Sequence, residues 1–363
     1  MHLGSGAHIG VMVIPAALAL SQRENWTGEQ LLKGIVAGYE MAVALGVSVR
    51  HSGSCNPHFR PSGIVGGFAA AGAGVAADDS MSLSTGANAL GFGANAAAGL
   101  NEWAWTGGTE INTQLGTASR GGITSLDLAR SGMHSSGTVL EGKNGLFAAY
   151  NCGVNAAQKF REWLADSECG DGIMGVTFKP FAGCNFIQTP ISVALQLREE
   201  VNEHLQQIRN VLIVTSSPAK NYPGCDSYGP FERVQQTKMS LQYGVSAALL
   251  FGCIDEFAYT QYDNENLQAL IRKCDISTDA EYDRDFVKGR QPCRIEICMT
   301  DGTKHQGSLQ DVLWLDGPAV EDRFRQEAEQ FFDPQTVDRV WRACHGLKDA
   351  QSCTQLFQLL ASV

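Results

Sequence analysis

Two stretches made largely of glycine and alanine constrain this chain more than any other feature. They read SGIVGGFAAAGAGVAAD over 62–78 and STGANALGFGANAAAGL over 84–100. An isolated helix this rich in glycine is weak, but small residues allow helices to pack backbone to backbone. Asp78, Asp79 and other polar residues interrupt the apolar pattern and argue against a membrane span. The stretches therefore predict a bundle of helices that are buried on several faces.

Length and composition favour a globular protein of two domains without a nucleic-acid partner. The chain has 363 residues, 44% of them hydrophobic and 18% charged, which suits a substantial core. Its formal net charge of −11 argues against nucleic acid or an anionic membrane as the main partner. The first twenty residues lack the basic start of a signal peptide, and no uncharged apolar run reaches membrane-spanning length. We expect a cytoplasmic protein.

The cysteines predict neither a metal site nor a disulfide framework. They are odd in number, scattered, and include no C-x-x-C pair. Such thiols are typical of a reducing cytosol, where most act as small hydrophobic side chains. The eleven are Cys55, Cys152, Cys169, Cys184, Cys225, Cys253, Cys274, Cys293, Cys298, Cys344 and Cys353.

The periodicity changes twice along the chain. A capping-box pattern at Thr27 and Gln30 opens a predicted helix, and helical patterning dominates up to about residue 177. A mixed α+β region then follows, and charged helical patterning returns after about residue 318. The mixed region contains predicted strands at 210–215 and 294–300, a predicted helix at 230–251, and a hairpin-turn signal at Asp301-Gly302.

The stretch FKPFAGCNFIQTP, residues 178–190, connects a strand-like segment to a predicted helix. Thr189 is the expected N-cap and Pro190 the expected first helical residue. The positive end of a helix favours anions, so this connection is a candidate binding segment. An ordinary capped loop is the alternative.

Six blocks in one order carry a resemblance that covers nearly the whole chain. The chain resembles the MmgE/PrpD family, which includes 2-methylcitrate dehydratase, cis-aconitate decarboxylase and iminodisuccinate epimerase. The resemblance implies a helical domain of residues 1–177 and 319–363, an inserted α+β lid of residues 178–318, a homodimer, and an active site between the domains without metal or organic cofactor. The blocks are HIGVMVIPAALAL, GEQLLKGIVAGYEMAVALG, HFRPSGIVGGFAAAGAG, EGKNGLFAAY, FKPFAGCNFIQTP and MSLQYGVSAALLFGCI.

The resemblance assigns functional positions to four residues. His8 matches a family histidine that precedes the first Pro-Ala segment, and Tyr243 matches a tyrosine in a helix of the inserted domain. Lys179 and Cys184 match the lysine and the cysteine at the two ends of one motif of that domain. His8 would act as base or acid, Tyr243 as proton donor and Lys179 as a partner for a carboxylate. The alternatives are a helix-entry histidine, a core tyrosine with one hydrogen bond, a solvated lysine, and an inert buried thiol at Cys184.

The chain departs from the family pattern at several positions. Arg60 replaces a histidine, although His58 lies two residues earlier, and Gln188 replaces a second histidine. Ile111 falls where the family has a lysine, and the sequence starts after the family's Asp-Asp-Thr segment. Arg60 would bind a carboxylate through its fork of donors, or else form an ion pair. His58 would replace the missing histidine, or else face solvent.

Three functions remain open on the sequence. Asn185 and Gln188 are candidate substrate-binding amides beside the groups named above. The first function is a lyase, of dehydratase or decarboxylase type, acting on a small organic acid by acid–base proton transfer. The second is an isomerase or epimerase of specialised metabolism. The third is a catalytically inactive homologue that binds a metabolite.

Overall fold

The computed structural model describes residues 1–50, 58–166, 168 and 170–361, and it divides into two compact units. The described chain is mainly helical with one four-stranded sheet, which confirms the predicted fold class. The first unit contains Met1–Leu100, Glu110–Thr177 and Asp316–Val363, and the second contains Asn101–Thr109 and Phe178–Leu315.

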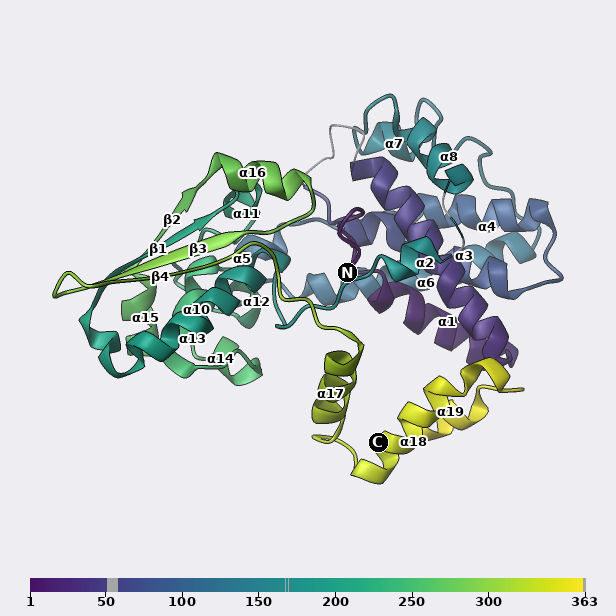
Figure 1. Ribbon diagram of the computed structural model, residues 1–363. Coiled ribbons are helices and arrows are strands. Elements are labelled where there is room, and N and C mark those ends of the chain that lie inside the picture. The colour runs from purple at the N-terminus through teal and green to yellow at the C-terminus, as the bar shows by residue number, and fades with distance from the viewer. Residues whose placement is uncertain (51–57, 167, 169, 362–363) are drawn as a thin grey trace. The chain divides into compact units, whose positions relative to one another are not determined.

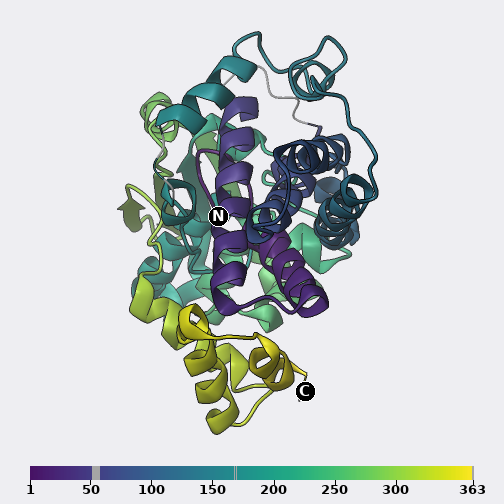
Figure 2. The same ribbon diagram turned by 90° about the vertical axis from the view of Figure 1, so that its right-hand side faces the viewer.

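The first unit is built from helices (Figure 1). Figures 1 and 2 both show its last helices, in yellow, next to the end of α1, in purple. The elements are α1 (Gly10–Glu24), α2 (Gly28–Arg50), α3 (Pro61–Ala77), α4 (Leu83–Asn95), α6 (Glu110–Arg130), α7 (Leu146–Ala149), α8 (Ala156–Asp166), α9 (Asp171–Met174), α17 (Gly317–Ala328), α18 (Pro334–His345), the 3₁₀ helix η3 (Leu347–Asp349) and α19 (Thr354–Leu360).

Helix α3 is buried on several faces in the first unit, as the small-residue pattern predicted. Fourteen of its 17 residues are buried, and it packs against α1, α2, α4 and α6. A methyl group added at Gly67 or at Gly93 of α4 would lie 2.7 Å from the carbonyl oxygen of the other glycine. The absence of side chains is therefore what allows α3 and α4 to touch through their backbones. The second small-residue helix ends at Asn95, five residues earlier than the pattern indicated.

Helix α2 begins with the predicted capping box. The backbone N–H of Gln30 donates to Thr27 Oγ1 (3.2 Å), and the backbone N–H of Thr27 donates to Gln30 Oε1 (2.9 Å). By length and composition α2 would also be long and apolar enough to cross a membrane. More than half of that apolar stretch is buried inside the structure, as in the core helix of a bundle.

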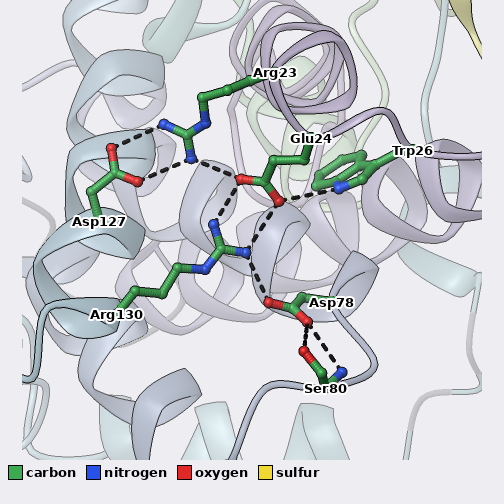
Figure 3. Close-up of polar contacts among 7 residues, drawn as sticks. All are labelled: Arg23, Glu24, Trp26, Asp78, Ser80, Asp127 and Arg130. Atoms are coloured by element: carbon green, nitrogen blue, oxygen red, sulfur yellow. Dashed lines mark hydrogen bonds and ion pairs between the residues drawn. The ribbon is translucent and has the colours of Figure 1, made fainter.

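A network of charged side chains joins α1, the end of α3 and α6 (Figure 3). Arg130 of α6 binds both oxygens of Glu24 on α1 (2.7 and 3.2 Å) and Asp78 at the end of α3 (2.8 Å). Burial raises the pKa of Glu24, but hydrogen bonds from Arg130 and Arg23 outweigh it and lower that pKa below its usual value. Hydrogen bonds from Ser80 and Arg130 lower the pKa of Asp78. The network thus links segments that lie far apart in the sequence.

We expect Arg130→Met to lower the free energy of unfolding by about 1–2 kcal/mol at neutral pH, because two carboxylates lose their shared partner. Because the pKa values of Glu24 and Asp78 are lowered in the folded state, their contribution is present above their ordinary values of 4.5 and 3.8 and is lost as the pH falls through the lowered values. Urea unfolding at a series of pH values should show that the stability difference between Arg130→Met and the unaltered protein shrinks over that acid range. Arg120→Met, at an exposed site on the same helix, is the control. An equal loss for both variants would contradict the assignment.

The second unit contains the sheet and the helices packed on it. The strand order is β2-β1-β3-β4, with β1 parallel to β2 and antiparallel to β3, and β3 antiparallel to β4. Helix α10 packs on β3 and β4 and against α13. The elements are α5 (Trp103–Thr106), η1 (Asn185–Ile187), α10 (Gln188–Val201), η2 (Asn202–Gln207), β1 (Ile208–Thr215), α11 (Ser217–Asn221), α12 (Val234–Thr237), α13 (Leu241–Phe251), α14 (Glu256–Thr260), α15 (Glu265–Ile271), β2 (Cys274–Thr278), α16 (Ala280–Val287), β3 (Cys293–Met299) and β4 (Lys304–Leu309).

Three local predictions in this unit require correction. The predicted helix 230–251 is two helices, because Ser240 is extended and its hydroxyl accepts the N–H of Tyr243 (3.0 Å), which starts α13 anew. Thr189 lies inside α10, which begins one residue earlier. Residues 101–109 belong with the second unit, where Gln236 Nε2 donates to the carbonyl of Trp105 (3.1 Å).

Candidate functional site

The candidate residues of the first unit lie around the start of α3. Arg60 directly precedes α3, is 8% exposed, and its Nη1 donates to the backbone carbonyl of Ile111 (2.8 Å). His8 precedes α1, and its backbone N–H donates to the hydroxyl of Ser62 in the first turn of α3 (3.0 Å). His58 lies two residues before Arg60 and is exposed. The structure therefore brings His8 and Arg60 to the same end of α3.

This end of α3 suits an anion. The first N–H groups of a helix carry a partial positive charge, and a guanidinium adds a full one. The guanidinium of Arg60 also donates to the backbone carbonyl of Ile111, and position 111 is where the resemblance places a family lysine. A cation is thus present beside position 111, although it comes from another part of the chain.

In the second unit, residues 178–188 fold into a compact connection that Gln188 holds together. Its Oε1 accepts the N–H of Phe181 (3.0 Å), and its Nε2 donates to the carbonyls of Phe181 (3.1 Å) and Cys184 (2.9 Å). Lys179 Nζ donates to the carbonyl of Gly183 (3.0 Å). Gln188 is fully buried, so its amide is used to shape this connection.

We expect Gln188→Leu to lower the free energy of unfolding by about 2–4 kcal/mol, because it removes three hydrogen bonds from the buried amide to the backbone of the connection. Urea unfolding followed by circular dichroism measures the loss. Gln196→Leu, on the exposed side of the same helix, is the matched control and should change stability by less than about 0.5 kcal/mol. Equal effects of the two substitutions would show that the three hydrogen bonds contribute nothing.

Cys184, within this connection, faces a second thiol. Its sulfur lies 3.8 Å from the sulfur of Cys225, which the sequence did not single out. Cys184 is partly exposed and Cys225 is completely buried. The Cys225 hydrogen bond lowers the pKa of Cys184 against the opposing effect of burial, and the Lys179 charge lowers it further. Burial raises the pKa of Cys225. Cys184 is therefore the thiol that ionises first.

Three enclosed polar atoms near this connection have no hydrogen-bond partner within the described part of the chain. They are Asn185 Oδ1, Thr189 Oγ1 and the hydroxyl of Tyr259. A Cβ at Gly183 would lie 2.9 Å from that hydroxyl, so Tyr259 abuts the connection. No motif in the sequence pointed to Tyr259. Asn185 remains a candidate binding amide, and the hydroxyl of Tyr259 is an additional candidate binding group.

Tyr243 is completely buried in α13. Its hydroxyl donates to the backbone carbonyl of Ala258 (2.8 Å), and its ring packs edge to face on Phe231. Burial raises its pKa well above the usual value. This arrangement corresponds to the alternative of a core tyrosine with one hydrogen bond.

The candidate residues do not line either of two hollows near the C-terminal helices. One, of about 340 Å³, is lined by residues of α18, η3 and the segment that follows; the other, of about 250 Å³, lies between the end of α1 and α19. Among the described residues, no group of three or more histidine, cysteine or acidic side chains is placed to hold a metal ion.

Comparison with known families covers both units. The model for the MmgE/PrpD N-terminal domain matches residues 1–159, and the model for the MmgE/PrpD C-terminal domain matches residues 181–344. No curated protein matches the chain. The two matches together span most of the sequence, in the order in which the six blocks occur. The chain therefore belongs to the MmgE/PrpD family, which is known for dehydratases and related enzymes.

Proposed function

We propose that the protein is a lyase that removes water or carbon dioxide from a small organic acid by acid–base proton transfer. Arg60 binds a carboxylate of the substrate, and His8 exchanges a proton with the adjacent carbon. Within the second unit, Lys179 and Asn185 are candidate binding groups. Family membership supports the reaction class, and the choice of residues rests on their chemistry.

The observation that carries this proposal is the joint placement of His8 and Arg60 at the start of α3. Removal of a proton next to a carboxylate needs a base beside the carbon and positive charge beside the oxygens. The backbone N–H of His8 donates to Ser62, which places residue 8 at this helix end, and the bond from Arg60 Nη1 to the carbonyl of Ile111 holds the guanidinium there. A histidine and a guanidinium at one helix end meet both needs.

The test is a screen of small hydroxy, dicarboxylic and tricarboxylic acids with the purified full chain in deuterated water. Mass spectrometry that shows loss of water or carbon dioxide supports the lyase. An isobaric product that carries deuterium from the solvent identifies an isomerase or epimerase instead. A ligand that protects the chain against thermal unfolding without turnover identifies a metabolite-binding homologue. The last two outcomes each overturn the lyase proposal.

One observation favours the isomerase or epimerase as a second candidate. Elimination of water needs an acid that protonates the leaving hydroxyl. Gln188, in place of a family histidine, does not titrate, and its amide is occupied by the connection it holds. An isomerisation needs only proton exchange at carbon, for which His8 is a candidate group in the first unit and the thiol of Cys184 a candidate group in the second.

A further inference from the structure

Two sulfur atoms of the second unit are held face to face by the backbone. Cys184 and Cys225 are 41 positions apart, and their sulfurs are 3.8 Å from each other. The N–H of Cys184 donates to the carbonyl of Lys238 (2.8 Å), and the N–H of Leu241 donates to the carbonyl of Cys225 (2.9 Å). Both cysteines are thus tied to the few residues that lead into α13. These two backbone hydrogen bonds hold the two cysteines beside the same short segment and so bring their sulfurs into contact.

The two thiols are chemically unequal. The Cys225 thiol, the charge of Lys179 and the backbone N–H groups of Phe186 and Asn185 lower the pKa of Cys184 against the opposing effect of burial. Cys225 is fully enclosed, and the carboxylate of the adjacent Asp226 opposes its ionisation. A thiolate is the reactive form of cysteine, and a cation with N–H donors stabilises it. Cys184 is therefore the nucleophile of the pair, and Cys225 is the proton-bearing neighbour.

We propose that Cys184 and Cys225 form a peroxide-reactive dithiol, in which Cys184 is oxidised first and Cys225 then closes a disulfide with it. The Cys184 thiolate attacks one oxygen of a hydroperoxide, the O–O bond breaks, and a sulfenic acid and hydroxide (or alkoxide) form. The Cys225 sulfur attacks the sulfenic sulfur, its proton leaves with the hydroxyl group as water, and the S–S bond forms. Two thiols are oxidised and one peroxide is reduced.

The geometry suits both steps. Residue 184 is partly exposed and residue 225 is completely buried, so a small oxidant approaches the pair from the side of Cys184. A disulfide requires the sulfurs to approach to about 2.0 Å, which from 3.8 Å is a movement within reach of side-chain rotation and small loop shifts. The disulfide would bind the connection 178–188, with Lys179 and Asn185, to the segment before α13.

The test uses the full reduced chain, hydrogen peroxide in slight excess, and peptide mapping by mass spectrometry. We expect a cross-linked peptide pair that contains Cys184 and Cys225. In Cys225→Ser and Cys225→Ala, dimedone should instead capture a sulfenic acid at Cys184. In Cys184→Ser, Cys225 should remain unmodified. Cys274→Ser removes another buried thiol, one that contacts a hydroxyl, and should leave the cross-link intact.

Rates provide the second arm of the test. Exposed Cys253 and Cys344 in the same sample serve as internal references, and Cys184 should react faster than either by about three- to tenfold. Lys179→Met should lower the oxidation rate of Cys184 by a similar factor and leave the oxidation rate of Cys253 unchanged. If Cys184 is consumed without a cross-link to Cys225, or reacts no faster than Cys253, the proposal is overturned.

Discussion

Replacing Gly122 with alanine is expected to lower the free energy of unfolding of the helical unit by about 3 kcal/mol or more. Gly122 is buried on α6 where that helix meets α3. An added Cβ would lie 2.4 Å from the Cβ of Ala70, 2.6 Å from the backbone nitrogen of Ala71 and 2.8 Å from the carbonyl oxygen of Gly67. Two of these atoms belong to the backbone of α3, so relief requires the helices to separate. Thermal and urea unfolding of the full chain measure the loss.

The same helix contains a matched control. Gly116 is exposed on α6, and an added Cβ there would meet nothing within 4 Å. Gly116→Ala should leave stability unchanged or raise it by about 0.5–1 kcal/mol, because alanine is the better helix former. If Gly122→Ala behaves like Gly116→Ala, the two helices do not rely on close backbone contact, and the interpretation of the small-residue stretches is wrong.

Replacing His8 with glutamine is expected to reduce kcat by about 10²–10⁴-fold on the acid that the screen identifies. Glutamine keeps a polar side chain of similar size but does not titrate, so it removes proton transfer while the backbone N–H still donates to Ser62. Circular dichroism and thermal unfolding should remain those of the unaltered protein. A fall in kcat with preserved folding identifies His8 as a group that acts in the reaction.

Two further variants separate catalysis from structure. His134→Gln, at an exposed site of the same unit, should leave kcat unchanged. Tyr243→Phe should lower stability by about 1 kcal/mol through the lost bond to Ala258 and change kcat little. Wild-type turnover in His8→Gln would refute the assignment of His8. A loss of kcat in Tyr243→Phe without a loss of stability would indicate that Tyr243 acts as the proton donor.

Local features of the fold were predictable from the sequence. The capping box at Thr27 and Gln30, strand β1, and the hairpin turn at Asp301-Gly302 all depend on residues only a few positions apart. The predicted helix 230–251 failed for an equally local reason. The hydroxyl of Ser240 accepts the backbone N–H of Tyr243 and so starts a second helix. This capping signal is present in the sequence, but the prediction followed the apolar periodicity of the whole stretch instead.

The sequence proposed the residue types of the candidate site but could not indicate the partners of these residues. Family resemblance named His8, Arg60 and Cys184, yet the contacts of Arg60 with Ile111 and of Cys184 with Cys225 join positions 51 and 41 residues apart.

The sequence by itself determined the family, through six blocks in one order. It also determined the helical and mixed regions and the need for close packing of the small-residue helices, because periodicity and side-chain volume act along the chain. Only the tertiary structure decided that Gln188 is used to shape a loop, that the hydroxyl of Tyr243 is enclosed, and that two thiols touch. Those outcomes depend on which distant backbone groups fold beside each side chain, and a hydrogen bond is made or lost over less than 1 Å.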